Sequence, residues 1–263
     1  MTTTTRRTRR TRVLGVALGA AVATGTVALT PAAAQAAPAS SKVYVTHGLP
    51  LDDAGTKVDV FAGAAGSGVA GAGLVLDDFV FGETRGPLDL PAASYSIYLA
   101  TPTAGDDGTL TSDEVVYAQD LAVPAGQNLS VVASFTADAK PNLAVFSNDL
   151  SATKRYEGRL SIRHAAAAPA VNVDLGLFPF NRIFPKYFTK TVGPASNGQQ
   201  ADLDVFAWPY DVKVKVASSG ATVAGVDRFP VKPRTLTNVY AVGVPGKSFT
   251  FVTQTIPLAS AKG

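Results

Sequence analysis

The sequence predicts an all-β protein made of two tandem immunoglobulin-like or transthyretin-like β-sandwich domains after a signal peptide. Three observations favour this fold: short alternating segments, turn residues between them, and one segment pattern that occurs in both halves of the chain. Alternation of apolar and polar residues with a period of two is typical of half-buried strands. No window shows the sustained 3.6-residue periodicity and the capping residues of a helix.

The first 36 residues have the composition of a secretory signal peptide. Residues 1–12 contain five arginines and no acidic residue, residues 13–29 are apolar, and AQA at residues 34–36 offers small residues for cleavage after Ala36. The apolar stretch is too short and too interrupted for a spanning helix, so we expect no membrane span in the mature chain. General secretion and twin-arginine export both stay open. We expect a secreted protein, extracellular or loosely associated with the cell wall.

Alternating segments follow one another from residue 42 onwards. Pro, Gly, Asn and Asp stand between them, which are the residues that favour turns. In chain order the segments read KVYVT, KVDVF, SYSIYLA, EVVYAQDLAV, LSVVASF, NLAVFS, RLSIRH, AVNVDL, DLDVFAW, DVKVKVA, TNVYAVGV and SFTFVTQTI. Each is long enough for one strand of a sandwich.

One stretch of the first half superposes on one of the second half without a gap. The segments are LDLPAASYSIYL (residues 88–99) and LDVFAWPYDVKV (residues 203–214). Six positions agree in type: Leu88/Leu203, Asp89/Asp204, Leu90/Val205, Tyr95/Tyr210, Ile97/Val212 and Leu99/Val214. A repeat of this kind predicts duplicated units, which we place at residues 40–155 and 156–263.

Each half also carries one of the two histidines of the chain. His47 and His164 each end a strand, a turn follows, and the next segment opens on Val-Asp-Val or Val-Asn-Val. Together with the LPAASY entry and the later AGQNLSVVA segment, these features resemble the domain of unknown function 4397 family, in two copies. The turns GLPLDDAGT and AAAAPA depart from the family's Ala-Ser-Pro-Asp-Ala-Pro-like turn. The resemblance covers nearly all of the chain after the signal peptide and implies a secreted β-sandwich module without an assigned activity.

The histidines have a structural and a chemical interpretation. An imidazole with an orienting carboxylate can act as a general base, and Asp59 could orient His47. Alignment of the valines, however, places Asn172 opposite Asp59, and an amide cannot replace a carboxylate. We therefore predict that His47, Asp59, His164 and Asn172 are structural turn residues, which hold polar turns through hydrogen bonds.

Other motifs point to no cofactor or metal ion. The chain has no cysteine, and one histidine per domain is a poor start for a zinc site. GSGVAG (residues 66–71) fits a dinucleotide-binding pattern, but no helix pattern follows it. The acidic GDDGTLTSDE (residues 105–114) lacks the ligand order of an EF-hand, so we expect a solvated loop.

The two halves differ most where the first has GAAGSGVAGAG and the second has GLFPFNRIFPKYFTK. This aromatic stretch has two interpretations. Its rings could plug the open end of their own sandwich or the joint between the domains, because aromatic side chains bury large areas. They could also form a binding patch, because aromatic residues and Arg dominate interface hot spots. The candidate interaction patch contains Phe178, Phe180, Arg182, Phe184, Lys186, Tyr187 and Phe188.

Charge is distributed unevenly between the halves. The chain has 23 Lys+Arg and 20 Asp+Glu, and five of the arginines precede residue 37. The remainder is slightly acidic, which removes the main argument for nucleic-acid binding. Residues 37–156 carry 6 basic and 14 acidic side chains, whereas residues 157–263 carry 12 and 6. We expect this split to support charge pairing between the domains, or head to tail between chains.

The sequence therefore predicts a secreted, non-catalytic β-sandwich binding or structural module that acts at the cell envelope or extracellularly. Its partner would be an unidentified envelope polymer or protein. The alternative is an envelope hydrolase or metal-dependent enzyme that uses the strand-end histidines. No nucleophile elbow, HExxH motif or histidine cluster supports that alternative.

Overall fold

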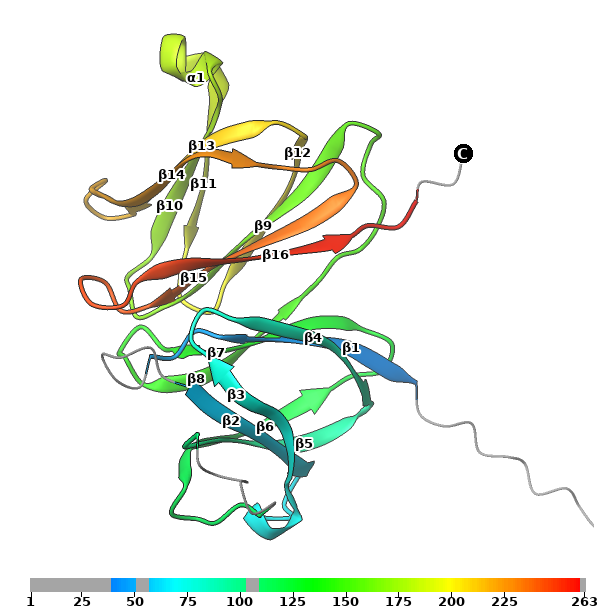
Figure 1. The fold of residues 1–263 in the computed structure, drawn as a ribbon. Helices are drawn as coiled ribbons and strands as arrows, with labels where there is room; N and C mark the ends of the chain where they lie inside the picture. Colours follow the sequence, from blue (N-terminus) through cyan, green and yellow to red (C-terminus); the bar gives the residue numbers. More distant parts are fainter. Residues whose placement is uncertain (1–38, 51–56, 103–108, 261–263) are drawn as a thin grey trace, which may run out of the picture. The chain divides into compact units, whose positions relative to one another are not determined.

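The structure is a computed structural model of the 263-residue chain, and it describes residues 39–50, 57–102 and 109–260. Nearly all of its regular structure is β, as the alternation predicts, and its strands form two sandwiches of two four-stranded sheets each (Figure 1). The expected signal peptide lies outside the described residues. Among the described residues, no helix has the length and apolar character needed to cross a membrane.

The first sandwich contains the strands from β1 to β8. One sheet has the strand order β4-β1-β7-β8 and the other has the order β3-β2-β5-β6. Strands β1 and β7 run parallel, and the other neighbours are antiparallel. The bounds are β1 Ser40–His47, β2 Lys57–Ala64, β3 Gly73–Val80, β4 Thr84–Pro91, β5 Ala93–Ala100, β6 Val115–Val123, β7 Asn128–Phe135 and β8 Pro141–Ser147.

The second sandwich repeats this topology strand by strand. Its sheets have the orders β12-β9-β15-β16 and β11-β10-β13-β14, and β9 and β15 are the parallel pair. The bounds are β9 Glu157–Ala166, β10 Val171–Leu177, β11 Thr189–Ala195, β12 Gln200–Phe206, β13 Pro209–Val216, β14 Thr222–Pro230, β15 Thr235–Gly243 and β16 Thr250–Pro257. The superposed stretches of the sequence therefore lie on equivalent strands, β4–β5 and β12–β13.

Three short helical segments interrupt the strands. A 3-10 turn at Val69–Gly71 follows β2, and it falls within GSGVAG, where a dinucleotide site would require a long helix. Two four-residue helices, α1 (Phe180–Ile183) and α2 (Pro185–Phe188), lie between β10 and β11. The aromatic stretch of the second half forms these two helices. The acidic stretch is described only from residue 109, where the carboxylate of Glu114 accepts hydrogen bonds from the amide and hydroxyl of Thr111.

Each sandwich has an apolar core between its own sheets, and a third cluster joins the two sandwiches. Inward side chains such as Val43, Phe79 and Leu99 form the first core, and Leu160, Val173 and Tyr210 belong to the second. Outward side chains of β7 and β8 pack on outward side chains of β9, β15 and β16, namely Val132, Ala144, Phe146, Ala165, Tyr240, Val242 and Val252. Both faces of these strands are consequently covered, so β7, β9 and β15 are buried along almost their whole length.

Gly48 shows how closely the two sandwiches approach. A Cβ atom at this position would lie 2.6 Å from Cγ1 of Val242 and 3.0 Å from the carbonyl oxygen of Ala133. Real Cβ contacts are not that short, so only glycine fits between β7 and β15 there. The residue after the first strand-end histidine is therefore part of the contact between the sandwiches.

A buried arginine lies at the centre of this contact. The guanidinium of Arg163 donates hydrogen bonds to Oδ1 of Asn148 (2.6 Å) and to the carbonyl oxygen of Ser147 (3.0 Å), both at the end of the first sandwich. It also donates to the hydroxyl of Tyr240 (3.0 Å), and it lies over the rings of Phe146 and Tyr240 at 5.2 and 5.3 Å. Burial lowers the pKa of Arg163 from its ordinary value, which is the cost of placing a charge away from water.

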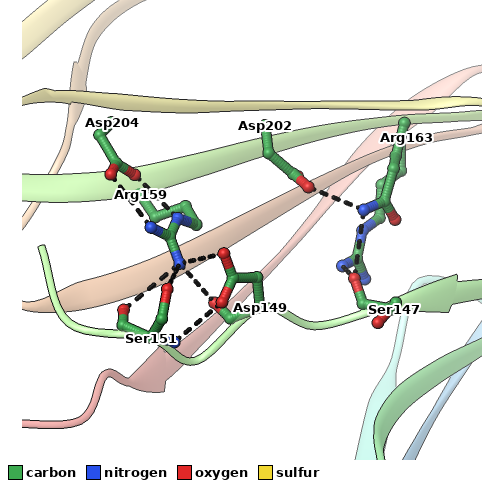
Figure 2. A network of polar contacts seen from close by, with 8 residues as sticks. Ser147, Asp149, Ser151, Arg159, Arg163, Asp202 and Asp204 are labelled. Carbon is green, nitrogen blue, oxygen red and sulfur yellow. Dashed lines mark hydrogen bonds and ion pairs between the residues drawn. The ribbon is translucent and has the colours of Figure 1, made fainter.

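Charge pairing between the two repeats is sparse among the described residues. Figure 2 shows Arg159 at the joint, where its guanidinium reaches Asp149 (2.6 Å) and Asp204 (2.8 Å). Besides Arg159–Asp149, only the exposed Lys154–Glu157 pair crosses the boundary in the described part of the chain. Arg159–Asp149 is thus an ion pair between the two repeats, while apolar groups and neutral polar groups make most of the contact. A broader pairing of an acidic face with a basic face stays a prediction. Head-to-tail pairing between chains stays a prediction.

Candidate functional site

The two strand-end histidines occupy equivalent buried places. His47 ends β1 and His164 lies near the end of β9, and both are buried. In each case Nδ1 accepts a long hydrogen bond, 3.4 Å, from the backbone amide two residues later, Leu49 or Ala166. Equivalent turns of the duplicated sequence thus use the histidine in the same way.

The tautomer of His164 follows from its two partners. Because Nδ1 accepts, Nε2 carries the proton and donates it to the carbonyl oxygen of Pro169 at 2.9 Å. Burial lowers the pKa of His164 below its ordinary value of 6.5, although the bond to Pro169 opposes the shift. The neutral ring therefore stabilises the turn after β9 through hydrogen bonds at both of its nitrogens.

This geometry gives a pH dependence. A histidine whose folded pKa is lowered contributes stability above its unfolded pKa, and the contribution is lost as the pH falls through the folded value. We expect the melting temperature to decline below pH 6.5, because a protonated Nδ1 can no longer accept from Ala166. Melting curves of the wild type and of His164→Gln, taken between pH 7.5 and 5, measure this. Equal declines in both proteins would contradict the assignment to His164.

Asp59 and Asn172 occupy equivalent positions, as the alignment of the valines predicts. Asp59 of β2 pairs with Ala100, and Asn172 of β10 pairs with Lys215, which is the residue that the repeat superposes on Ala100. The carboxylate of Asp59 is buried and accepts a hydrogen bond from the amide of Asp78 (2.8 Å). Asn172 is half-buried. Their role as turn residues stays a prediction.

Asp59 also lies within a group of three carboxylates. Ligand atoms of Asp59, Asp77 and Asp78 lie within 4.8 Å of one another, and the latter two residues are exposed. Lys57 forms an ion pair with Asp78 (2.7 Å), and Arg85 donates to the carbonyl oxygens of residues 77 and 78. Lys57 balances one of the three carboxylates, and exposed carboxylates alone do not define a metal site.

The aromatic stretch lies on the surface of the second sandwich. Tyr187 is 78% exposed, Phe184 is 54% exposed, and Phe180 and Phe188 are exposed with their rings 5.3 Å apart. Ile183 between them is 66% exposed. Arg182 and Lys186 are exposed as well, whereas Phe178 is half-buried beneath the guanidinium groups of Arg182 and Arg228.

Two exposed aromatic side chains outside the stretch extend this surface. Phe206 ends β12 and Trp208 lies between β12 and β13, with their rings 6.3 Å apart. Nε1 of Trp208 donates to the carbonyl oxygen of Phe178 at 2.6 Å. We define the aromatic surface as Phe180, Phe184, Tyr187, Phe188, Phe206 and Trp208. Phe206 and Trp208 were not among the predicted patch residues, although the short FAWPY segment signals them.

One carboxylate attaches the helices to the sandwich. Asp211 of β13 accepts hydrogen bonds from Nε of Arg182 (2.7 Å), from Asn181 (3.2 Å) and from the amide of Arg228 (3.1 Å). The hydrogen bond from Arg182 is the largest influence that lowers the pKa of Asp211 to about 2. Since Asp211 stays ionised in all but strong acid, this attachment is independent of pH in the ordinary range.

A polar pocket adjoins the aromatic surface. It has a volume of about 280 Å³, and Asn181, Pro185 and Lys186 form one side. Asp174, Lys213 and Lys215 contribute charged groups from β10 and β13, and Lys215 is paired with Asp174 at 2.6 Å. The arrangement offers flat apolar rings beside hydrogen-bonding groups, which suits binding.

The chain thus forms two β-sandwiches of the same topology, each with a buried histidine at a strand end. A family model for a domain of unknown function (DUF4397) matches residues 41–174, and the chain belongs to this family. The match covers the first sandwich and continues into β10 of the second. No curated protein matches the chain.

Solved structures match only distantly. The fimbrial anchor protein Mfa2 from Porphyromonas gingivalis is 10% identical, with 83% of this chain and 98% of that chain covered and a TM-score of 0.22. The Bacillus anthracis TIE protein is 10% identical over 78% of this chain, with a TM-score of 0.22. This chain spans 34% of that protein. Likeness at this level carries no argument about function.

Proposed function

We propose that this chain is an exported, non-catalytic binding module made of two tandem copies of the family domain. It acts at the cell envelope or outside the cell, and it binds an envelope polymer or protein through the aromatic surface. The observation that carries the proposal is the exposure of aromatic side chains on helices that a buried carboxylate, Asp211, fixes to the sandwich. Exposed apolar groups in a cluster mark interaction sites, because water contact with them is unfavourable.

The rigidity of the attachment matters for this function. A surface that is already ordered before binding loses little conformational entropy when a partner docks. Aromatic side chains with few rotatable bonds supply large contact areas at low entropic cost. The bonds of Asp211 and Trp208 hold the loop in this ordered form.

The enzyme alternative lacks a suitable site at His164. General-base catalysis requires a ring nitrogen that can reach a substrate, and both nitrogens of His164 face backbone groups of their own turn. The histidine turns therefore favour a structural role, which supports the non-catalytic proposal.

We expect Phe180, Phe184 and Tyr187 to be needed for binding and dispensable for folding. Their simultaneous replacement by Ser should change the melting temperature little, since the side chains are exposed, and should abolish retention of the purified protein on envelope polymers or secreted partner proteins. Sedimentation with fractionated envelope material and a melting curve of each variant provide the two measurements.

Leu74→Ser is the matched control. Leu74 is 44% exposed on β3 of the first sandwich and does not belong to the aromatic surface. It should leave retention unchanged. If the triple variant melts far below the wild type, the three rings belong to a core; if it melts normally and is retained like the wild type, the aromatic surface does not bind.

A further inference from the structure

The second sandwich is hollow between its sheets. A cavity of about 200 Å³ lies among inward side chains of the two sheets, including Leu160, Val173, Val212 and Phe251. The corresponding cavity of the first sandwich has a volume of only about 50 Å³. Two units of the same topology thus differ in how completely they fill their cores.

The hollow continues towards one end of the sandwich. A second cavity of about 270 Å³ is lined by the turn after β9 and by Pro245, Gly246 and Phe249 between β15 and β16. The two cavities share His164, Val171, Val214 and Ala241 as walls. The two cavities therefore adjoin each other, the inner one between the sheets and the outer one beneath the end turns.

The strand registers show which smaller side chains of the second sandwich account for its larger cavity. Val58 of β2 pairs with Phe79 of β3, and the equivalent residue Val171 of β10 pairs with Ala195 of β11. Phe79 of the first core thus has Ala195 as its counterpart. On the neighbouring strand, the repeat replaces Ile97 by Val212 and Leu99 by Val214. All three changes shorten a side chain that points between the sheets.

The side chains that line the cavities favour an apolar ligand. Nearly all lining side chains are aliphatic or aromatic, and His164 uses both ring nitrogens for its own turn. The guanidinium of Arg163, another wall residue, is bound on the far side to Tyr240 and Asn148. Apolar cavities of about 150 Å³ stay dry and take up small hydrocarbons, because an unfilled space loses dispersion contacts.

We propose that the second sandwich binds an acyl chain that runs through these two adjoining cavities. The chain would enter beneath Pro245 and Gly246 and lie between Val171, Val214 and Ala241, with its polar headgroup in solvent. Lys247 follows Gly246 in the exposed turn at this end and offers a cation to an acidic headgroup. A free fatty acid and the chain of a lysophospholipid share the chemistry that the cavity recognises.

Equilibrium titration of the mature chain with decanoic acid tests the proposal. We expect saturable binding of one molecule per chain and a rise in melting temperature with ligand concentration. A lysophospholipid with a decanoyl chain forms the second arm; binding of either compound supports an acyl-chain site, and preference for one identifies the source. Absence of saturable binding for both would overturn the proposal.

Variants that restore the residues of the first repeat make the test specific. Val212→Ile with Val214→Leu should fill part of the space, keep or raise the melting temperature without ligand, and weaken decanoic acid binding at least tenfold. Ala195→Phe should abolish binding; if this larger change prevents folding, the double variant decides. Val145→Leu, on the exposed face of β8, is the control that should bind like the wild type. Equal binding by the folded double variant and the wild type would contradict an occupant in the cavity.

Discussion

Replacement of Arg163 by Ala is expected to lower the free energy of unfolding by about 3–5 kcal/mol, because buried acceptors lose their donor at about 1–3 kcal/mol each and a large buried side chain is truncated. The change removes four hydrogen bonds of a buried guanidinium, to Ser161, Tyr240, Ser147 and Asn148. It also leaves a void between the rings of Phe146 and Tyr240. Because these groups come from both sandwiches, the contact between the sandwiches should weaken. Denaturant unfolding followed by circular dichroism measures the effect.

A second variant at position 163 separates charge from packing, and a variant at Arg155 is the control. Arg163→Met keeps an unbranched stem between the rings and should lose less stability than Arg163→Ala, since buried ionic groups are often replaced by apolar ones at little cost. Arg155→Ala removes an exposed arginine at the joint and should change the free energy by no more than about 0.5 kcal/mol. If Arg163→Ala behaved like Arg155→Ala, the buried network would not hold the sandwiches together.

Replacement of Phe79 by Ala is expected to cost about 3–5 kcal/mol, the usual range for truncation of a buried aromatic side chain. Phe79 is almost fully buried, packs near the ring of His47 at 5.6 Å, and fills the core of the first sandwich. The variant gives the first sandwich the residue that the second has at Ala195, so the first core should acquire a hollow of its own. Chemical denaturation reports the loss.

Val145→Ala is the control for this change. It removes apolar atoms from a side chain that is 44% exposed on β8, and little destabilisation is expected. A Phe79→Ala variant as stable as Val145→Ala would mean that Phe79 does not fill the core, and it would remove the structural reason for the hollow second sandwich.

Local patterns predicted the strands because alternation and turn residues act within a few positions. The superposition of residues 88–99 on 203–214 predicts equivalent positions for β4–β5 and β12–β13, which the strand bounds confirm. The correspondence of Asp59 in the first repeat to Asn172 in the second was predictable for the same reason, since both follow a valine near the start of a strand. The positions of the strands and the register of the repeat are encoded locally, and the structure confirms both predictions.

Features that depend on distant strands were beyond sequence reasoning. Arg159, Ser161 and Arg163 alternate with apolar residues along β9, which is also the pattern of an ordinary solvated face. Only the packing of the first sandwich on this face buries Arg163. The hollow behind Ala195 likewise requires the register of β10 with β11.

The aromatic stretch had two interpretations because its own residues do not determine what covers them. Phe178 is covered by Arg182 and Arg228, and the latter comes from β14, far away in the sequence. The remaining rings find no comparable cover and are exposed. Composition predicted an unusual segment, and tertiary structure places it on the surface.

Hydroxyl-radical footprinting of the protein on the envelope fraction that retains it tests the binding proposal most directly. Exposed aromatic rings react readily with the radical, and a bound partner shields them. We predict lower oxidation of Phe180, Phe184 and Tyr187 in the bound state, while the exposed Leu74 of the first sandwich reacts as it does in free protein. Unchanged oxidation of these three rings, with protection confined to the turns that follow His47 and His164, would contradict it.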